Sequence, residues 1–481
     1  MGSADLPPLG AGIVYASALE PLLDRRPELF TVLEFEPQTT WVKLPAHARS
    51  DGRQPYRMDR DALARVARLP GRKIVHSIGT PVGGTLRPEP AQLDLLRETV
   101  ACLDAAWVSD HLSFNRTPEF ATGFFLPPRQ TLPGVAAAVA AIGDLRAALP
   151  VPVAVETGVS YLRPRPEELP DGEFAGRVAD GADCGLLLDL HNVYCNAVNG
   201  RQPVDAFLDQ IPLDRVWEVH LAGGMEFEGF WLDAHSGAVP GPLLALARKT
   251  IPRLPNLKAI VFEIFSSFIP VVGLDLIAAE MERLHELWTL RRPGIPVAAP
   301  VWPPRAAEVD ALTPAAWESA LGALVLGRRG AAPGPIAEEP GHRVVESLVH
   351  EFSASMIVRV LPLTARLLLL SLGPTPFRVL LNDFWARSTP GLYANVEAEA
   401  FAGHLEGLHL PVPHLAEVLA FERAAIATLL DGTARIVPFA VEPLPLLRAL
   451  ADGRLPAEAG RAGRFEIEIT PEDVAAQINA R

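Results

Sequence analysis

The sequence is poor in cysteine, has no hydrophobic run long enough to cross a membrane, and carries fewer basic than acidic residues. Its three cysteines, Cys102, Cys184 and Cys195, are an odd number and lie in apolar or strand-like contexts. That usage is typical of structural thiols in a reducing compartment and argues against a scaffold built on disulfides. We therefore expect a cytoplasmic protein with free thiols.

Targeting signals are lacking as well. The first ten residues, MGSADLPPLG, have neither a basic start nor an apolar core, so we expect no signal peptide. The most apolar stretch, Val358 to Gly373, is shorter than the roughly 20 residues of a spanning helix and contains Arg366. The pattern predicts a buried helix there and no membrane partner.

Basic residues are outnumbered, with 43 Lys and Arg against 57 Asp and Glu and a formal net charge of −14. Because binding to a phosphate backbone depends on clustered Lys and Arg, this balance argues against a nucleic-acid partner. Hydrophobic residues make up 49% of the chain and charged residues 21%, which is typical of a globular protein with a large core.

Eight short apolar runs recur through the first 265 residues, and seven of them end at or near a residue that can bind a metal. The first run is Gly12 to Ala16, and the others lead to Glu34, His76, His111, Glu156, Asp189, His220 and Glu263. Successive donors are between 31 residues (Asp189 to His220) and 45 residues (His111 to Glu156) apart, which suits a strand, a helix and two loops. Eight such units predict a (β/α)₈ TIM barrel of the α/β class, whose catalytic residues lie at the C-terminal strand ends.

A chain of 481 residues is long for one domain, so we expect two. The pattern predicts the barrel in residues 1–295 and, in residues 296–340, a linker with a short helix capped by Thr313. Residues 341–481 show helical patterns and a final alternating segment, GRFEIEIT, typical of an exposed strand. We expect this smaller, mainly α-helical domain to lack a catalytic constellation of its own.

The converging donors predict a metal centre at the barrel mouth. Crowded, buried carboxylates repel one another and take up protons unless cations lie between them. In the loop after His220, Asp233 and His235 are two residues apart, and such side chains project to one side of an extended segment. The expected metal ligands are His76, His111, Glu156, Asp189, His220, Asp233, His235 and Glu263. Eight ligands exceed the needs of one ion, so we expect two or three, and nitrogen and oxygen donors favour iron, manganese or zinc.

Three further residues are candidate catalytic groups beside these ligands. Asn192 is a neutral ligand or a group that orients Asp189, Asp110 hydrogen-bonds a ligating histidine, and Glu34 serves in either way. His191 is expected to point away from the side of Asp189, because neighbours alternate along a strand. The remaining histidines have no partners at ligand spacing and are assigned to surface or core positions: His47, His285, His342, His350, His404, His409 and His414.

Several of these motifs resemble, in the same order, those of the multinuclear non-haem iron-dependent oxidative enzymes, which are peptide-modifying TIM barrels long catalogued as a domain of unknown function. The matching segments are DLHNVYCNAVNG, EVHLAGG and LDAHSG, with VHS, SDHLSF and VETGVSY upstream and FEIF downstream. They cover about residues 8–290. Many members have a second histidine where Gly224 stands here, and Asn or another small polar residue in place of His191, which suggests a subgroup with its own pocket.

The resemblance implies a site of two or three iron ions, Fe(II) or Fe(III), that activates dioxygen (O2) to modify a ribosomal precursor peptide. Known members act mostly on cysteine side chains or the backbone near them, and commonly work with a partner protein that captures the leader part of the peptide. The segments PFRVLLNDFWARSTPGLYANVEAEAFAGHL and HLAEVLAFERAA resemble such partners. We therefore expect a fused recognition domain in place of a separate partner, with a helical oligomerisation domain as the alternative.

Two other enzyme classes share a metal-binding barrel. A phosphoesterase of the endonuclease IV type has a trinuclear site, but it needs a basic face for DNA. A sugar isomerase of the xylose isomerase type uses a Lys beside its metals, whereas Lys73 and Lys258 stand at strand starts. A non-catalytic metal-binding protein is disfavoured by the open barrel mouth, since purely structural sites are closed.

Overall fold

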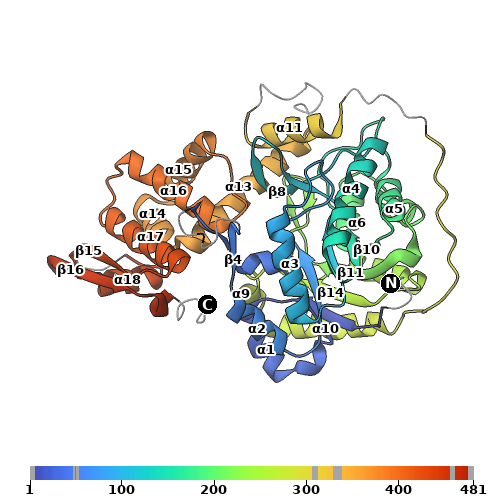
Figure 1. Ribbon diagram of the computed structural model, residues 1–481, viewed down its shortest axis with the longest axis horizontal. Helices are drawn as coiled ribbons and strands as arrows, with labels where there is room; N and C mark the ends of the chain where they lie inside the picture. The colour runs from blue at the N-terminus through green and yellow to red at the C-terminus, as the bar shows by residue number, and fades with distance from the viewer. Residues whose placement is uncertain are drawn as a thin grey trace.

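The computed structural model describes residues 6–46, 49, 54–305, 312–328, 339–455 and 461–474. Its larger part is a closed barrel of eight parallel strands ringed by helices, at the right of Figure 1. Each strand pairs with the next of the set along the chain, and the last closes the ring against the first. The expected (β/α)₈ barrel is confirmed. The barrel strands are β1 (Gly10–Val14), β2 (Val32–Phe35), β5 (Arg72–Ser77), β6 (Val108–His111), β9 (Val153–Glu156), β10 (Gly185–Asp189), β11 (Val216–Ala222) and β14 (Ala259–Glu263).

The strands are buried on both faces because helices cover the outside of the barrel. Strands β9, β10 and β14 read VAVE, GLLLD and AIVFE, and every residue in them is buried. The helices of this part are α1 (Glu20–Arg25), α2 (Arg60–Arg68), α3 (Pro90–Leu103), α4 (Leu132–Ala148), α5 (Asp171–Gly181), α6 (Leu190–Val198), α7 (Val204–Leu208), α8 (Gly241–Thr250), α9 (Ile269–Val272) and α10 (Leu274–Trp288). Short 3₁₀ turns lie at Ser17–Leu19, Pro27–Leu29, Pro37–Thr40, Leu213–Arg215 and Ile251–Arg253.

Alternate side chains along each strand point into the barrel, which gives it an apolar lower layer and a polar upper layer. Val32, Ile74, Ala154 and Val261 belong to one apolar cluster together with Trp107. Each of those four strand residues stands two positions before a predicted donor: Glu34, His76, Glu156 and Glu263. The apolar layer therefore forms the floor on which the donors stand.

Three hairpins follow barrel strands and so rise at the C-terminal end of the barrel, where the donors lie. They are β3 (Trp41–Lys43) with β4 (Tyr56–Met58) after β2, β7 (Phe114–Arg116) with β8 (Ala121–Leu126) after β6, and β12 (Met225–Phe227) with β13 (Phe230–Leu232) after β11. They build up the wall of the barrel mouth.

The C-terminal region is mainly helical, as expected, and is drawn in orange and red in Figure 1. It has its own apolar core, in which Phe384, Phe401 and Leu450 are fully buried. The final alternating segment is a strand, as expected, and it pairs antiparallel with a second strand that was not predicted. Its elements are α13 (Gly341–Val360), α14 (Pro362–Leu372), α15 (Pro374–Arg387), α16 (Ala394–Leu408), α17 (Leu415–Asp431), β15 (Arg435–Val441), α18 (Pro443–Ala451) and β16 (Ala462–Ile469).

The predicted linker helix is α11 (Pro314–Val325), and the Thr313 side chain caps it by accepting a hydrogen bond from the Ala316 amide. Trp317 of α11 and Val345 of α13 pack with Phe114 and Leu126 of the β7–β8 hairpin in one apolar cluster. The linker helix and the C-terminal region are therefore joined to the wall of the barrel mouth. Residues 306–311 and 329–338 of the predicted linker lie outside the described residues.

The expectation of one buried helix over Val358–Gly373 is wrong. Helix α13 ends at Val360 and α14 begins at Pro362, and the two helices meet at 111°. Leu361 has φ −116° and ψ 54°, outside the helical region, because a residue before proline is sterically disfavoured there. No single helix among the described residues has the length and apolar character to cross a bilayer; only the bent pair α13 and α14 together meets that criterion.

Candidate metal centre

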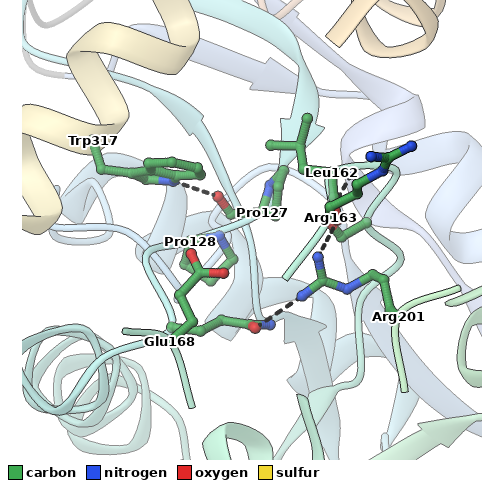
Figure 2. Close-up of a pocket in the computed structure, with 9 residues that line it drawn as sticks. Pro127, Pro128, Leu162, Arg163, Glu168, Arg201 and Trp317 are labelled. Atoms are coloured by element: carbon green, nitrogen blue, oxygen red, sulfur yellow. Dashed lines mark hydrogen bonds between the residues drawn. The ribbon is translucent and has the colours of Figure 1, made fainter. Parts of the chain in front are cut away.

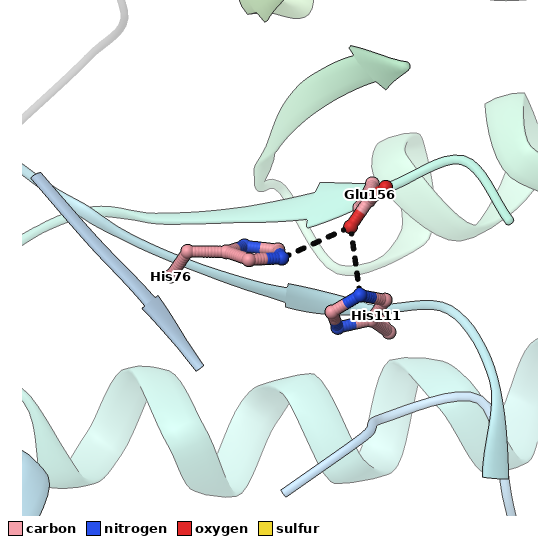
Figure 3. A group of neighbouring side chains, drawn as sticks. All are labelled: His76, His111 and Glu156. Carbon is pink, nitrogen blue, oxygen red and sulfur yellow. Dashed lines mark ion pairs between the residues drawn. The ribbon is translucent and has the colours of Figure 1, made fainter. Parts of the chain in front are cut away.

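His76, His111 and Glu156 come from the ends of the neighbouring strands β5, β6 and β9 and point toward one another (Figure 3). Glu156 Oε2 lies 3.2 Å from His76 Nε2 and 3.1 Å from His111 Nε2. Two ligand atoms about 2.1 Å from one ion and at right angles to each other lie about 3 Å apart, so these spacings suit a shared ion. The other ring nitrogen of His76, Nδ1, is 2.8 Å from Ser109 Oγ, which holds Nε2 toward Glu156.

Asp189, His220 and Glu263 extend this group across the mouth. Ligand atoms of Glu156, Asp189 and His220 lie within 4.8 Å of one another, and so do those of Asp189, His235 and Glu263. His220 Nδ1 is 3.1 Å from Glu263 Oε2. Because Glu156 and Asp189 each belong to two groups, the donors form one continuous centre rather than separate sites.

Asp233 and His235 reach the centre from the loop after β13. His235 Nε2 is 2.9 Å from Asp233 Oδ1 and 3.4 Å from Glu263 Oε2. The expected extended backbone is wrong at His235, which has φ +45°, in the left-handed region. The loop is held there by a hydrogen bond from the Phe265 amide to the His235 carbonyl at 3.1 Å. Such backbone strain persists only where the surroundings impose it, and it is concentrated at functional sites.

Several ligand atoms of this centre are buried and make no hydrogen bond. They are Glu156 Oε2, Asp189 Oδ2, His220 Nδ1, His235 Nε2 and Glu263 Oε2. Most of these atoms lie at ion-pair distance from another predicted ligand, but the two groups are not aligned as in a hydrogen bond. Since an unsatisfied buried polar group costs about 1–3 kcal/mol, five in one place indicate a shared bonding partner such as a metal cation. Imidazole and carboxylate without thiolate fit iron, manganese or zinc.

The charges of these side chains depend on their neighbours. Burial, together with the Asp233 carboxylate, raises the pKa of Asp189 well above its usual range. Burial by itself would lower the pKa of His111, but the Glu156 carboxylate raises it to about 9. Burial is likewise outweighed at His235, where Asp233 raises the pKa to about 10. The metal-free centre therefore holds protons that a bound cation would displace.

Asn192 contacts two of the predicted ligands. Its Nδ2 donates to Glu156 Oε1 at 3.2 Å, and its backbone amide donates to Asp189 Oδ1 at 2.7 Å. Its own Oδ1 is buried without a hydrogen bond. The side chain therefore orients Glu156 and not Asp189, which only the backbone amide contacts. Its free oxygen leaves the role of a neutral ligand open.

Glu34 stands beneath two of the predicted histidine ligands. Its Oε2 is 2.9 Å from His220 Nε2, and its Oε1 is 3.6 Å from His76 Nδ1. A carboxylate that accepts the second N–H of a ligating histidine fixes the orientation of the ring. His220 Nδ1 faces Glu263, which suits the supporting role for Glu34. Ligand atoms of Glu34, Glu218 and His220 also lie within 4.8 Å of one another, which suits a ligand role, so both roles expected for Glu34 stay open.

Asp110 does not make the expected hydrogen bond to a histidine ring. Its Oδ2 accepts from Thr80 Oγ1 at 2.5 Å, and its Oδ1 accepts from the backbone amide of His111 at 2.7 Å. The His111 ring Nδ1 is 3.9 Å from Asp110 Oδ1 and lies closer to the Ser77 carbonyl, at 3.3 Å. Asp110 thus holds the backbone of His111 and the side chain of Thr80 by hydrogen bonds. Its carboxylate also contributes to the raised pKa of the His111 ring.

Sequence reasoning missed two carboxylates. Glu218 Oε1 is 3.5 Å from His220 Nε2, and its Oε2 accepts a hydrogen bond from Trp107 Nε1 at 2.9 Å. Burial raises the pKa of Glu36, against the opposing effect of the nearby His76. Each is two residues from a predicted donor on the same strand or its continuation, so the period of two along a strand could have revealed them.

His191 also belongs to this region, contrary to expectation. Strand β10 ends at Asp189 and helix α6 begins at Leu190, so the alternation assumed for a strand does not continue to His191. The ring is fully buried, and its Nδ1 lies 2.8 Å from Asp233 Oδ1.

The other histidines described lie away from the centre, and His47 lies outside the described residues. His285 contacts the Leu29 carbonyl at 2.9 Å, and His350 stacks on Trp385. The three cysteines are free thiols, as expected; Cys184 and Cys195 are buried, whereas Cys102 is exposed.

A small pocket lies apart from the donors, beside α11 (Figure 2). Trp317 Nε1 donates to the Pro127 carbonyl at 3.0 Å on one side of it. On the other side Arg201 is bound to Asp171 and to Gln130 Oε1. Arg201 is therefore already paired.

Proteins of similar sequence match about half of this chain. A UPF0276 protein of Chromobacterium violaceum is 32% identical over 230 residues, which are 48% of this chain and 82% of that protein. A UPF0276 protein of Neisseria meningitidis is 30% identical over 251 residues, 52% of this chain and 84% of that protein. The match to a UPF0276 protein of Streptomyces avermitilis, at 31% identity, spans 47% of this chain and 48% of that one, so those two chains have similar lengths.

Solved structures show only distant likeness. A xylose isomerase domain protein from Planctomyces limnophilus is 14% identical with a TM-score of 0.37, and covers 59% of this chain and 97% of its own. A D-allulose 3-epimerase from Methylomonas sp. is 15% identical with a TM-score of 0.36, and the match covers 60% of this chain and 100% of that one. Neither bears on the reaction.

The profile of one protein family, described as RiPP precursor modification enzyme MbnB/TglH/ChrH, matches residues 25–288, more than half of the chain. RiPP denotes a ribosomally synthesised and post-translationally modified peptide. The matched residues include every barrel strand but β1 and all the predicted ligands. The family expected from the sequence motifs is therefore confirmed: this chain belongs to the MbnB/TglH/ChrH family of RiPP precursor modification enzymes.

Proposed function

We propose that the chain uses two or three iron ions, Fe(II) or Fe(III), and dioxygen to oxidise a ribosomal precursor peptide at a cysteine or a neighbouring backbone position. The observation that carries the proposal is the continuous set of nitrogen and oxygen donors, with five buried atoms that make no hydrogen bond, at the open end of the barrel. The family supplies the peptide as the class of substrate.

The residues that would hold the ions are the eight predicted ligands, with Glu156 and Asp189 shared between adjoining groups. Bound iron would supply the one-electron chemistry that dioxygen requires. The chain itself orients the ligands, since Ser109 and Glu34 hold the rings of His76 and His220. Asn192 does the same for Glu156.

The direction of substrate approach follows from the exposure of the ligands. The side chains of His111 and His235 are 16% and 13% exposed, whereas His76 and His220 are buried. Phe125 stacks on His111 at 4.0 Å, and Phe265, which is half exposed, lies 4.6 Å from His235. These aromatic side chains offer apolar contact to an uncharged side chain such as that of cysteine.

In the same proposal, the chain consists of a catalytic barrel in residues 1–295, a linker in residues 296–340 and a further domain in residues 341–481. We assign recognition of the leader peptide to residues 341–481. The C-terminal region lies beside the mouth: Asn395 Nδ2 donates to the Lys43 carbonyl at 2.9 Å, and Arg57 donates to the Leu430 carbonyl at 3.0 Å. Phe352 of α13 lies 6.1 Å from Phe124 of the β7–β8 hairpin. A peptide held by this region would have its core segment within reach of the ligands.

The alternative of a sugar isomerase gains no support, because Lys73 stands at the closed end of β5 and donates to the carbonyls of Leu69 and Gly71 at 2.8 and 2.6 Å. The test is the metal content of protein purified without oxygen, with Mössbauer and EPR spectra, followed by dioxygen uptake on adding a synthetic peptide that contains cysteine. We expect two or three irons per chain and peptide-dependent uptake. Stoichiometric zinc that persists when iron is supplied would instead indicate a hydrolase of the endonuclease IV type.

A further inference from the structure

The His191 ring is enclosed by polar groups that fix its state. Its Nε2 is 3.2 Å from Trp231 Nε1, an N–H group that can only donate. His191 Nε2 must therefore accept this hydrogen bond, and the ring proton resides on Nδ1. From Nδ1 the ring donates to Asp233 Oδ1 at 2.8 Å, the oxygen that also contacts His235 Nε2 at 2.9 Å.

The segment that carries Asp233 is attached to helix α6 at more than this point. Asn199 Nδ2 donates to the Trp231 carbonyl at 2.9 Å, and the Trp231 amide donates back to Asn199 Oδ1 at 2.9 Å. The Asp233 amide donates to Tyr161 Oη at 3.0 Å. The backbone and the side chain of Asp233 are thus held by different groups. Among the described residues, the hydrogen-bond and ion-pair partners of its carboxylate are His191 and His235.

Gly224 provides the space for this arrangement. A Cβ at residue 224 would lie 2.5 Å from Trp231 Nε1 and 2.7 Å from His191 Nε2, closer than Cβ atoms approach nitrogen. Any side chain at residue 224 would therefore displace both the tryptophan donor and the histidine ring. The three residues form one unit, in which Gly224 admits Trp231, Trp231 sets the tautomer of His191, and His191 directs Asp233.

We propose that His191 is a positioning residue that holds the Asp233 carboxylate beside His235 for a metal ion, with Trp231 fixing its tautomer and Gly224 making room. The inference rests on the proposed metal centre. A histidine between a donor and a carboxylate ligand acts outside the ligand shell, and loss of such a residue typically weakens metal binding about 10–100-fold. Because both ring nitrogens already have hydrogen-bond partners, the ring would hold Asp233 without being a ligand itself.

The test is a titration of metal-free, full-length protein with Co(II), whose visible spectrum reports the coordination geometry, in competition with a chromophoric chelator. His191→Leu keeps the bulk but removes the donor, and we expect one class of Co(II) to bind about 10–100-fold more weakly with altered bands. His191→Asn places an amide N–H where Nδ1 stood, and we expect it to retain affinity within a few-fold of the unmodified protein. Trp231→Phe removes the nearer of the two groups that face Nε2, the other being Cys195 Sγ at 3.6 Å, and we expect a smaller loss in the same class.

Unchanged affinity and spectra in His191→Leu would overturn the inference. So would a His191→Asn variant as weak as His191→Leu, because the ring would then act by packing rather than through its N–H. If His191→Leu fails to fold, normal Co(II) binding by Trp231→Phe overturns the tautomer argument. Failure of the unmodified protein to bind Co(II) at all would instead contradict the metal centre on which the inference rests.

Discussion

At the scale of single residues, the centre is a set of side chains whose protonation is set by burial and by one another. Asp189 and Glu34 both have pKa values raised well above the usual range, with burial as the largest cause. The pKa of Glu263 is lowered despite its burial, because His220 and His235 are close. Such opposed shifts within one cleft are a feature of functional sites.

Removal of one predicted ligand should lower the metal content. In His220→Ala, we expect loss of at least one bound ion and of peptide-dependent dioxygen uptake, because its Nδ1 faces Glu263 in the centre. Metal analysis and an oxygen electrode measure the two effects, and circular dichroism checks the fold. His409→Asn, at an exposed left-handed helix cap, is the matched control and should retain all the metal. Unchanged iron in His220→Ala would refute the ligand assignment.

Metal binding should release protons. With pKa values of about 9 and 10, His111 and His235 are protonated at pH 7.5 in the metal-free protein, and both must lose a proton to bind a metal. We expect the apparent metal affinity to rise as pH increases toward 10. Calorimetry in two buffers of different ionisation enthalpy gives the number of protons released, and identical heats in both buffers would contradict the prediction.

The same shifts have the opposite effect on the stability of the metal-free fold. The two pKa values lie above the value of about 6.5 for an unfolded histidine, so the imidazolium form stabilises the folded state. This contribution is complete below pH of about 6.5 and is lost as pH rises through 9 and 10. The contribution of these two histidines to the Tm of the metal-free protein should therefore fall as the pH rises through 9 and 10. Metal affinity should increase over the same pH range.

At the scale of elements, helix α6 begins on a predicted ligand. The Asp189 side chain is the N-cap of α6 and accepts from the Asn192 amide at 2.7 Å. The two roles need different properties of the Asp189 carboxyl group. Capping a helix needs only an oxygen that accepts a hydrogen bond, whereas binding a cation is favoured by the negative charge of the carboxylate.

Two substitutions separate these roles of Asp189. Asp189→Asn retains a capping oxygen and removes a carboxyl group that burial disfavours in its charged form, so we expect metal-free protein of equal or higher Tm that binds less metal. Asp189→Ala should bind equally little metal and lose about 1 kcal/mol of stability with the cap. Metal titration and thermal unfolding measure both quantities. Full metal binding by Asp189→Asn would refute the role of the charge.

The β7–β8 hairpin links the centre to the C-terminal region. Phe125 stacks on His111, and the adjacent Phe124 faces Phe352 of α13, because neighbouring strand residues point to opposite faces. We expect Phe125→Ala to raise the KM for the peptide several-fold with unchanged metal content, since it removes a wall of the approach and no ligand. An unaltered KM would contradict this path of approach; Val301→Ala, at a fully exposed position, is the control.

At the scale of the whole molecule, all eight predicted ligands lie within the barrel, and the C-terminal region contributes none. A chain ending near Leu290 should therefore bind metal but lose affinity for the peptide. It also lacks α11 and α13, whose Trp317 and Val345 pack on the hairpin, so we expect a lower Tm. Metal analysis and fluorescence anisotropy with labelled peptide are the measurements, and full peptide affinity in the shortened chain would refute the recognition role of residues 341–481.

Much of the barrel follows from local sequence. Runs such as VPVAVE and LKAIVFEIF consist of residues that favour β-strands and carry a metal-binding residue near their C-terminal end. Each strand, and the end at which its metal-binding residue lies, could therefore be predicted from its own run alone. Repetition of the pattern then implied the barrel, and with it the meeting of His76, His111 and Glu156. The cap at Thr313 and the final strand were likewise readable, because both are short-range patterns.

Contacts between residues far apart in the chain were decided by the tertiary structure. Glu34 and His220 are 186 residues apart and lie on strands that do not pair, so they meet only because closure of the barrel turns both side chains inward. His191 could be placed only once β10 was seen to end at Asp189, which changes the direction of the next side chains from alternating to helical. The sequence by itself determined which residues point into the barrel; closure and the docking of β13 against α6 decided which of them touch, because distances across a barrel depend on all of its strands together.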